Sequence, residues 1–291
     1  MDQEPAQHRG YLQEDYRLFH LRDDAMQPVR WHYHSFHKIL VLLAGQASYA
    51  IEGQSYPLEP GDLVLVPRGC MHRPVLTGSA PYERFVLYLA PSFLRRCSTQ
   101  DCDLSTCFQL ACSRDHYVLR PDREDPRLPE LLLKLRRALA RPGFGQDVLC
   151  QALLLQFLVA VTRDLEAHQF HCVTSSACDG KIVALLKYLN LHLTERHSID
   201  SLSRQFYISK YYMMRRFKAE TGYTIHQYLT EKRLLLARER IAGGESLSQA
   251  SALCGFGDYS SFARAYKKRF GGSPNAPMRQ RAEEVSPVPL D

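Results

Sequence analysis

The chain lacks an uncharged apolar run of about 18 residues, the length that a membrane-spanning helix requires. Its first residues are polar and acidic, without the apolar segment of a secretory signal. These absences predict a protein that remains in the cytoplasm where it is made. With 291 residues, of which 45% are hydrophobic, the chain is long enough for two domains with apolar cores.

Closely spaced cysteine pairs of the Cys-x-x-Cys type are also absent. The chain has nine Cys, an odd number that cannot all pair in internal disulfides. Reduced thiols in a cytosolic protein are the simplest interpretation. A soft-metal or redox site is the alternative for the set that recurs every five residues, although this spacing fits neither a zinc knuckle nor one helix face. That set is Cys97, Cys102, Cys107 and Cys112.

Two segments in the last third of the chain resemble each other, residues 209–222 and, beginning 49 positions later, residues 258–271. Each opens with a good helix N-cap residue, Ser209 or Asp258, and each closes with Gly, which favours the left-handed end of a helix. The apolar pairs at helical spacing are Met213 with Phe217 and Phe262 with Tyr266. We therefore predict two copies of one short helix, each with one buried face.

A second helical segment precedes each copy, residues 199–206 and residues 247–254, and a short break separates the two. Helix, tight turn and basic helix form the helix-turn-helix arrangement, in which the second helix enters the major groove of DNA. Two ordinary helical hairpins are the alternative, and duplication of the same basic face argues against it. The residues expected to contact DNA are Ser209, Lys210, Tyr211, Met214, Arg215, Lys218, Tyr259, Ser260, Ala263, Arg264 and Lys267.

Different roles are expected within this set. Arg215 and Arg264 are predicted to read bases, because Arg can donate two hydrogen bonds to guanine. Lys218 and Lys267 lie about one turn further on and are predicted to meet phosphates.

Charge divides the chain in the same way. Residues 181–281 contain 18 Lys and Arg against 7 Asp and Glu, a net charge of +11, whereas residues 1–180 sum to −2. Phosphate neutralisation supplies most of the sequence-independent affinity for DNA. The distribution therefore predicts that only the C-terminal part binds a polyanion.

Residues 181–281 resemble the DNA-binding domain of the AraC/XylS transcription regulators. The resemblance is closest over residues 255–274, with a Gly-Phe turn, a basic aromatic stretch and a closing Gly-x-x-Pro. Ser203 and Ser251 stand where the family usually has Ala, and Tyr266 stands where it usually has Phe. These differences concern the packing of the helices.

The resemblance implies two helix-turn-helix subdomains joined by a long helix, here over about residues 224–242. It also implies double-stranded promoter DNA and RNA polymerase as partners. A protein that binds DNA without sequence preference is an alternative.

Short β-rich runs separated by turn residues occupy the chain from Lys38 to Leu89, which predicts a small sandwich or barrel. The runs are residues 39–43, 47–51, 55–58, 63–66 and 84–89. His32 and His34 precede the first run, and residues 61–72 match the second cupin motif, Gly-x5-Pro-x-Gly-x2-His, ending at His72.

This pattern resembles the cupin-type sensor domain that AraC regulators commonly carry. We therefore expect an α+β protein of two domains: an N-terminal cupin-like β-barrel with a helical dimerisation segment, and a C-terminal all-α double helix-turn-helix domain.

In metal cupins, two His, a Glu and a third His bind one divalent ion. Here Lys38 stands where the Glu is expected, with His37 just before it, so either His37 substitutes or there is no tight metal site. The metal candidates are His32, His34 and His72, and a metal-dependent cupin enzyme is the alternative function.

The favoured interpretation has no catalytic residue and no resident cofactor. We expect a polar-lined pocket for a small polar effector, and the resemblance favours a sugar or related carbon source. The expected ligand-binding residues are His32, His34, His72, Arg84 and Tyr88. Arg84 and Tyr88 share a strand face by period two, and a surface position for Arg84 is the alternative.

Two helical segments follow the strand region. One apolar stripe ends at Pro142, and the next helix is apolar on two faces, one with Val148 and one with Leu158. In the family such helices pair sensor domains in a homodimer, and burial inside one protomer is the alternative. The expected division is residues 1–169 as ligand-binding and dimerisation domain, 170–180 as linker, 181–282 as DNA-binding domain and 283–291 as a disordered tail.

Overall fold

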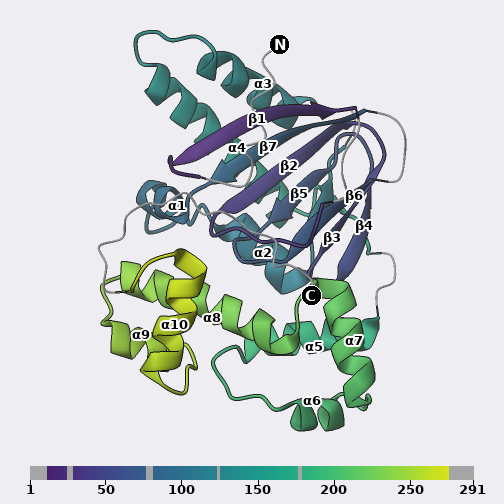
Figure 1. The fold of residues 1–291 in the computed structure, drawn as a ribbon. Coiled ribbons are helices and arrows are strands. Elements are labelled where there is room, and N and C mark those ends of the chain that lie inside the picture. Colours follow the sequence, from purple (N-terminus) through teal and green to yellow (C-terminus); the bar gives the residue numbers. More distant parts are fainter. Residues whose placement is uncertain (1–11, 25–28, 77–80, 123–124, 176–178, 275–291) are drawn as a thin grey trace.

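The computed structural model describes residues 12–24, 29–76, 81–122, 125–175 and 179–274 (Figure 1). The described residues up to 175 form a β domain, and residues 179–274 form a helical domain below it in the view of Figure 1. The strands are β1 (Tyr16–Asp23), β2 (His37–Ala44), β3 (Ala47–Ile51), β4 (Gln54–Leu58), β5 (Leu63–Val66), β6 (His72–Leu76), β7 (Tyr82–Leu89), β8 (Val118–Arg120) and β9 (His171–Cys172). The helices are α1 (Pro91–Cys97), α2 (Thr106–Arg114), α3 (Arg127–Leu139), α4 (Gln146–Glu166), α5 (Gly180–Leu191), α6 (Ile199–Gln205), α7 (Lys210–Thr221), α8 (Ile225–Ala242), α9 (Leu247–Leu253) and α10 (Tyr259–Phe270).

The β domain contains two antiparallel sheets. The larger has the order β1-β7-β2-β5-β8-β9, and the smaller has the order β4-β3-β6. Strand β2 lies between β7 and β5 and is buried along most of its length. Successive side chains of a strand point to opposite faces. Lys38 therefore points towards the smaller sheet, where it bonds Tyr49, whereas His37 points the other way and packs on Phe108 of α2.

The predicted fold class is confirmed by these two domains. All five predicted β-rich runs are strands, and the long helix predicted over residues 224–242 is α8, which begins at the capping box of Thr224 and Gln227. The structure adds strands β1, β6, β8 and β9 and helices α1 and α2 to the prediction. Strand β9 lies inside the segment expected as a linker and pairs with β8. The predicted tail, residues 283–291, lies outside the described residues.

Helix α4 has one buried face and one partly exposed face. Leu154, Leu158 and Val161 are fully buried in the core of the β domain, whereas Val148 is 68% exposed and Leu149 53% exposed. The alternative of complete burial inside one protomer is therefore wrong. By length and composition alone α4 could also cross a membrane, but a core helix passes the same test.

The helical domain shows the predicted duplication. The side chain of Ser209 accepts a hydrogen bond from the amide of Tyr212 at the start of α7, and the side chain of Asp258 accepts one from Ser261 at the start of α10. Gly222 and Gly271 end these helices in the left-handed conformation, as predicted. Helix α8 connects the unit of α6 and α7 with the unit of α9 and α10 (Figure 1).

Candidate functional site

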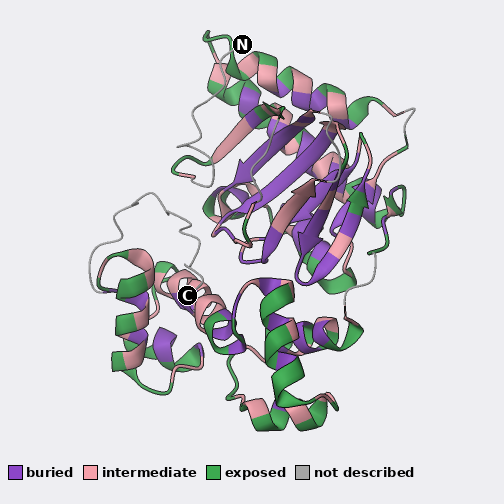
Figure 2. Cartoon of the chain, turned by 45° about the vertical axis from the view of Figure 1, so that its right-hand side comes forward, coloured by how far each residue is buried: buried purple, intermediate pink, exposed green. Residues whose placement is uncertain are grey.

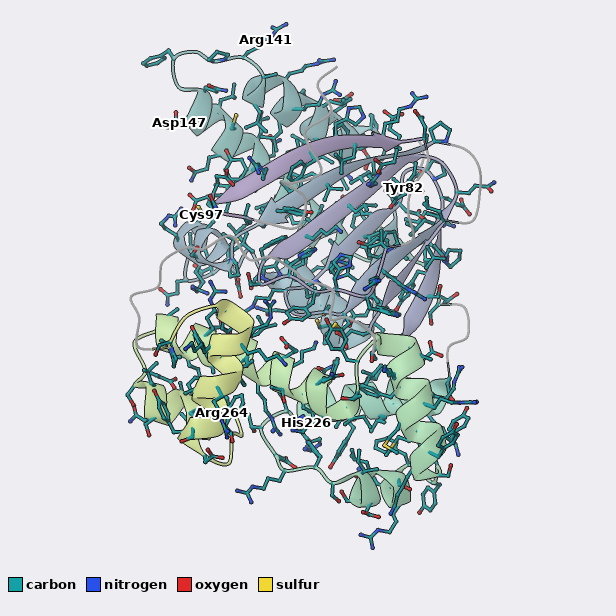
Figure 3. The ribbon with its side chains drawn as sticks, in the orientation of Figure 1. Tyr82, Cys97, Arg141, Asp147, His226 and Arg264 are labelled. Carbon is teal, nitrogen blue, oxygen red and sulfur yellow. The ribbon has the colours of Figure 1, made fainter. Side chains whose placement is uncertain are left out.

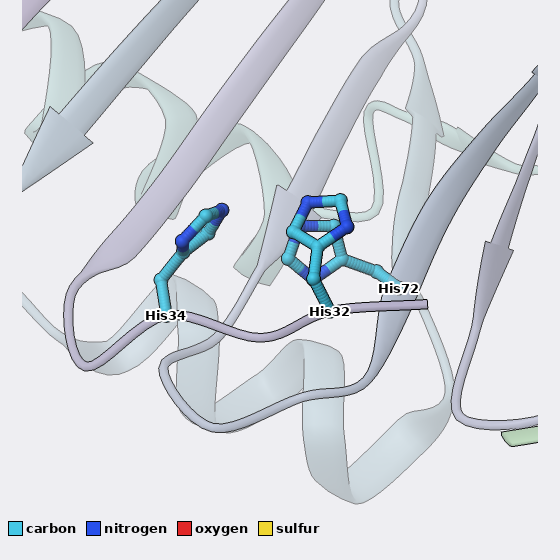
Figure 4. Close-up of side chains that lie close together, drawn as sticks. All are labelled: His32, His34 and His72. Carbon is cyan, nitrogen blue, oxygen red and sulfur yellow. The ribbon is translucent and has the colours of Figure 1, made fainter. Parts of the chain in front are cut away.

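Three histidines from two segments of the β domain form a cluster, as Figure 4 shows. His32 and His34 lie on the segment before β2, and His72 begins β6, where an isolated bridge pairs it with His32. The ring centroids of His32 and His72 are 4.3 Å apart, and each lies 5.1 Å from that of His34. The structure therefore brings together all three histidines that the sequence predicted as one site.

His34 and His72 are buried and His32 is half-buried, and the surroundings disfavour the charged form of all three rings. Burial lowers the pKa of His32 to about 4 and holds the pKa values of His34 and His72 well below the usual range, with Lys38 acting in the same direction. His72 donates Nδ1–H to the carbonyl of Cys70 at 2.9 Å. Both ring nitrogens of His34 and Nε2 of His72 have no hydrogen-bond partner within the described residues. Buried polar atoms are normally paired, so these nitrogens are available to a ligand.

Lys38 lies beside the three histidines, a role that was not predicted from the sequence. Its Nζ donates to the hydroxyl of Tyr49 at 2.9 Å across the two sheets, and Tyr49 stacks towards His72. Burial lowers the pKa of Lys38 to about 7, and the Arg84 charge acts in the same direction. One signal was available: a lysine in the apolar run of β2 sits on the inner face, where an ammonium needs a partner.

Strand β7 carries the other two residues that were predicted to bind the ligand, Arg84 and Tyr88. Arg84 is buried, donating to Asp23 at 2.7 Å and to the carbonyl of Tyr82 at 2.9 Å, so its alternative as a surface residue is wrong. Tyr88 pairs with Lys38 across β2 and β7 and lies 5.7 Å from the His34 ring. The hydroxyl of Tyr82, labelled in Figure 3, is another buried group without a partner in the described part of the chain.

The residues present fit a divalent metal poorly. The nitrogen atoms of His32, His34 and His72 lie within 4.8 Å of one another. However, the group found among the described residues contains no carboxylate, and the Lys38 ammonium lies close enough to lower the pKa of all three imidazoles. His37 cannot substitute for the missing Glu, because period two turns its ring onto Phe108. A positive charge beside neutral donors suits an oxygen-rich ligand better than a cation.

The five-residue cysteine repeat does not form a metal site. Within the described residues, the group of His, Cys, Asp and Glu able to hold a metal includes none of the four. Cys107 is fully buried on α2, and Cys97 accepts from Gln151 on α4. Cys112 instead lies against Cys70.

Helix α7 presents the predicted DNA-contacting face to solvent. Its inner residues Met213 and Phe217 are fully buried. On the outer face Tyr211 is 71% exposed and Met214 is 46% exposed, and the guanidinium of Arg215 lies over the Tyr211 ring at 5.8 Å. The other predicted residues of this unit that are exposed are Ser209, Lys210, Arg215 and Lys218.

Helix α10 repeats this arrangement with smaller side chains. Phe262 and Tyr266 are buried, and the predicted residues Tyr259, Ser260, Arg264 and Lys267 are exposed, with Ala263 half-buried. Arg264 folds back along its own helix, where Nε donates to the carbonyl of Ser260 at 3.3 Å. Arg264 belongs to the helical domain, well apart from Tyr82 of the β domain (Figure 3).

The two domains meet at the buried carboxylate of Glu52, which was not among the residues predicted from the sequence. Glu52, at the β3–β4 turn, accepts hydrogen bonds from the Met71 amide at 2.8 Å, the Tyr228 hydroxyl at 2.6 Å and Lys232 Nζ at 2.9 Å. Asn190 donates a further bond at 3.3 Å. We call this set of five residues the Glu52 contact. It joins a turn of the β domain to α5 and α8.

Electrostatics and backbone geometry both support the Glu52 contact. Burial raises the pKa of Glu52, but the attraction of Lys232 and the hydrogen bonds outweigh it, so the net pKa is lowered. Glu52 has a φ of +45°, and the Gly53 that follows has +77°. Two successive residues with positive φ are typical of a type I′ hairpin turn, an unusual conformation for Glu that the surrounding contacts hold in place.

Apolar packing extends the interface. Tyr33 and Met71 of the β domain are buried in the same cluster as Phe217 and Tyr228 of the helical domain. A Cβ atom on Gly222, at the end of α7, would come within 2.8 Å of Trp31 Cβ. Figure 2 shows that both domains have buried residues in their interior and exposed residues along their outer surfaces.

A smaller polar contact involves the second unit. Arg269 of α10 donates to the Tyr33 hydroxyl at 2.7 Å and to Glu231 at 3.0 Å. The basic residues at the end of α10 therefore divide between the two faces of the helix, because Lys267 and Lys268 are exposed while Arg269 faces the β domain.

Known proteins resemble both domains. Residues 16–158 match the family model of an AraC-like ligand binding domain, and residues 202–280 match that of a helix-turn-helix domain. The chain is 26% identical over 250 residues to the HTH-type transcriptional activator RhaS of Escherichia fergusonii, covering 84% of this chain and 85% of that protein. It is 26% identical over 245 residues to the probable transcriptional regulator LumQ of Photobacterium leiognathi, covering 84% and 90%. Among solved structures, ToxT from Vibrio cholerae aligns with 90% of this chain and 97% of its own at 11% identity, with a TM-score of 0.35.

Proposed function

This chain belongs to the AraC family of transcription regulators, and from that premise we propose that it is an effector-responsive, cytoplasmic regulator that binds promoter DNA sequence-specifically through α7 and α10. The duplicated, N-capped helices with exposed basic faces carry this proposal. RNA polymerase is the expected partner at the promoter. The chain is not proposed to be an enzyme, since its relatives in the comparison are regulators.

Selection of DNA by the purified protein tests this function. The full chain is mixed with a pool of random duplexes, bound fragments are sequenced, and the selection is repeated with candidate effectors. Enrichment of one motif with two sub-sites supports the proposal. Binding that does not distinguish the selected motif from random DNA would leave only the non-specific alternative.

The effector is proposed to be a small polar carbon compound that carries a carboxylate, such as a sugar acid. Lys38 is a buried cation whose described hydrogen bond goes to the neutral hydroxyl of Tyr49. A buried charge is costly unless it is paired, so an anionic oxygen beside Lys38 is stabilising. The unpartnered nitrogens of His34 and His72 and the Tyr82 hydroxyl provide further polar contacts for ring or chain hydroxyls.

Lys38 also gives effector binding a pH dependence. Because its pKa is about 7, the ammonium is present below that pH and is lost above it. Affinity for a carboxylate should therefore be constant at lower pH and fall as the pH rises above about 7. Calorimetry with a series of sugar acids and the matching neutral sugars, at pH values below and above about 7, measures this pH dependence of affinity. Lys38→Met should remove the preference for acids, while Lys134→Met on exposed α3 serves as the matched control.

The alternative function, a metal-dependent cupin enzyme, can be tested on the same purified protein. An enzyme of that kind should retain near-stoichiometric iron, manganese or zinc by elemental analysis. Loss of that metal should then abolish binding of the acid. The proposed regulator should bind the acid equally well before and after treatment with a chelator.

A homodimer is proposed through α4. Its second apolar face is exposed at the first turn, where Val148 and Leu149 lie, and Phe144 in the preceding loop is fully exposed. Large exposed apolar patches mark association sites. Val148→Glu should shift the protein to monomer in sedimentation experiments, whereas Lys134→Gln, an exposed polar position on α3, should not.

A further inference from the structure

Two cysteine thiols lie directly against each other beside the contact between the domains. Cys70 Sγ and Cys112 Sγ are 4.0 Å apart. Cys70 lies in the loop before β6, and Cys112 lies near the end of α2. A disulfide has a sulfur–sulfur distance of about 2 Å, so an approach of about 2 Å separates these thiols from a covalent bond.

The two thiols differ in access. Cys112 is exposed, whereas Cys70 is buried, so an oxidant from solvent meets Cys112 first. The contact with Cys70 lowers the pKa of Cys112, and the nearby Lys232 ammonium acts in the same direction. Thiolates in electropositive, accessible surroundings are the reactive ones. By contrast, burial raises the pKa of Cys107 to about 12.

We propose that Cys70 and Cys112 form a reversible thiol–disulfide site, in which Cys112 reacts with a peroxide and Cys70 resolves the product. The two thiols lie outside the DNA-binding faces and are not members of the histidine cluster, although the Cys70 backbone contacts His72. It gives the regulator a second input, the redox state of its surroundings, besides its effector.

The chemistry balances with hydrogen peroxide as oxidant. The Cys112 thiolate attacks one peroxide oxygen, the O–O bond breaks, and the released hydroxide takes up a proton to form water while Cys112 becomes a sulfenic acid. The Cys70 sulfur then attacks the Cys112 sulfur, the S–O bond breaks, and a second water leaves with the Cys70 proton. Two thiols lose two electrons in total, and one peroxide is reduced to two waters.

Disulfide formation would reach the domain contact through the backbone of Cys70. The Cys70 carbonyl accepts the bond that orients His72, and the amide of the next residue, Met71, donates to Glu52. Met71 is also fully buried in the cluster shared by both domains. Drawing Cys70 towards α2 therefore shifts the segment that holds both His72 and Glu52.

The single Trp of the chain provides a readout for this shift. Trp31 packs against the shared apolar cluster and against Gly222 at the end of α7. Its fluorescence therefore reports the contact between the β domain and the first helix-turn-helix unit.

The experiment treats the reduced, full-length protein with hydrogen peroxide, blocks free thiols and maps the linkages by mass spectrometry, with Trp31 fluorescence recorded in parallel. Variants are Cys112→Ser, Cys70→Ser and, in case the buried substitution prevents folding, Cys70→Ala. Cys102→Ser is the matched control, because Cys102 is the other cysteine described as exposed.

We expect a Cys70–Cys112 disulfide in the wild type and in Cys102→Ser, formed several-fold faster than Cys102 is oxidised and reversed by dithiothreitol together with the change in fluorescence. Cys112→Ser should show neither the linkage nor the fluorescence change, and Cys70 variants should accumulate sulfenic acid at Cys112. Oxidation of Cys112 no faster than Cys102, or over-oxidation in the wild type without a linkage to Cys70, would overturn the proposal. A disulfide that leaves Trp31 emission unchanged would overturn its coupling to the domain contact.

Discussion

The two helix-turn-helix units share a sequence pattern but have different surroundings. The inner residues of α7 belong to an apolar cluster that includes Tyr33 and Met71 of the β domain. Those of α10 belong to a separate, smaller cluster whose buried members come only from α8, α10 and the end of α9: Leu234, Ala237, Cys254, Phe262 and Tyr266. The first unit is therefore attached to the β domain by its core, whereas the second has a core of its own.

The two units also differ in their polar contacts with the β domain. The Glu52 contact anchors α5 and the first half of α8, beside the first unit. The second unit touches the β domain through Arg269, at the surface of its helix. The segment that contains His72 thus contacts the first unit through Met71 and Glu52, whereas the second unit is joined to the first by α8.

The largest expected difference concerns the two core phenylalanines. Phe217→Ala and Phe262→Ala each remove a fully buried ring and should each cost about 3 to 5 kcal/mol of unfolding free energy. Phe217→Ala should also alter Trp31 fluorescence and destabilise the β domain, because the cluster is shared. Phe262→Ala should melt the second unit locally. Urea unfolding followed by Trp31 emission and by circular dichroism separates the two, and equal effects of both variants on Trp31 would contradict the comparison.

Next in size is the Glu52 contact. Glu52→Gln keeps the shape but removes the charge that pairs with Lys232, and should weaken the domain contact by about 2 to 3 kcal/mol. Tyr33→Phe removes a hydroxyl from the contact of the second unit and should cost about 1 kcal/mol. The change in Trp31 emission against urea measures the first, and proteolysis between α8 and α10 measures the second. Equal losses in the two variants would remove the distinction between the units.

The Glu52 contact should weaken at acidic pH. The folded-state pKa of Glu52 lies below the ordinary value of 4.5. Its contribution to stability is therefore complete above that value and is lost as the pH falls through the folded-state pKa. In Glu52→Gln this part of the acid dependence should be absent, as measured by unfolding free energies over the acid range.

Local signals in the sequence predicted much of this architecture. N-cap residues, closing glycines and apolar spacing located α7, α8 and α10, since these signals act within a few residues of one another. Short β-rich runs between turn residues located the central strands. Strand β1 contains Arg17 and His20 among its apolar residues. It is defined by pairing with β7, whose residues lie 59 to 73 positions away along the chain, and no local pattern shows such pairing.

The candidate site was also predictable where its residues belong to a local motif. The motif ending at His72 and the pair His32 and His34 indicated the cluster correctly. Lys38 was noted only as the residue that replaces the expected Glu. The alternation of side chains along a strand would also have placed it on the inner face of β2. The Glu52 contact joins residues 180 positions apart in the case of Lys232, so only the packing of the domains reveals it.

A comparison of the two arginines tests base reading in each unit. Arg215 is flanked by the bulky exposed residues Tyr211 and Met214, whereas Arg264 has Ser260 and Ala263. Arg264→Ala should thus cost about 1 to 3 kcal/mol of discrimination, or about 5-fold to 150-fold, at one base of its half-site, and Arg215→Ala should leave residual preference. Binding to single-base variants of the selected operator measures both. A uniform loss in Arg264→Ala, with no base position relaxed, would assign that arginine to a phosphate.

The smallest expected effect concerns the two lysines one turn further on. Lys218 and Lys267 are both exposed, and loss of one phosphate contact should lower the slope of log affinity against log salt by about 0.9 without changing base preference. The units should differ again, because Lys267 is followed by the exposed Lys268, whereas Lys218 is followed by Ala219. Lys268 can move to the vacated phosphate, so Lys267→Ala should lose less affinity than Lys218→Ala, and the double variant Lys267→Ala with Lys268→Ala should restore the full loss. Titrations at several salt concentrations, with Lys134→Ala in the β domain as the control, measure these slopes. A larger loss in Lys267→Ala than in Lys218→Ala would mean that Lys268 points away from the DNA and that the second unit depends on a single phosphate contact at this turn.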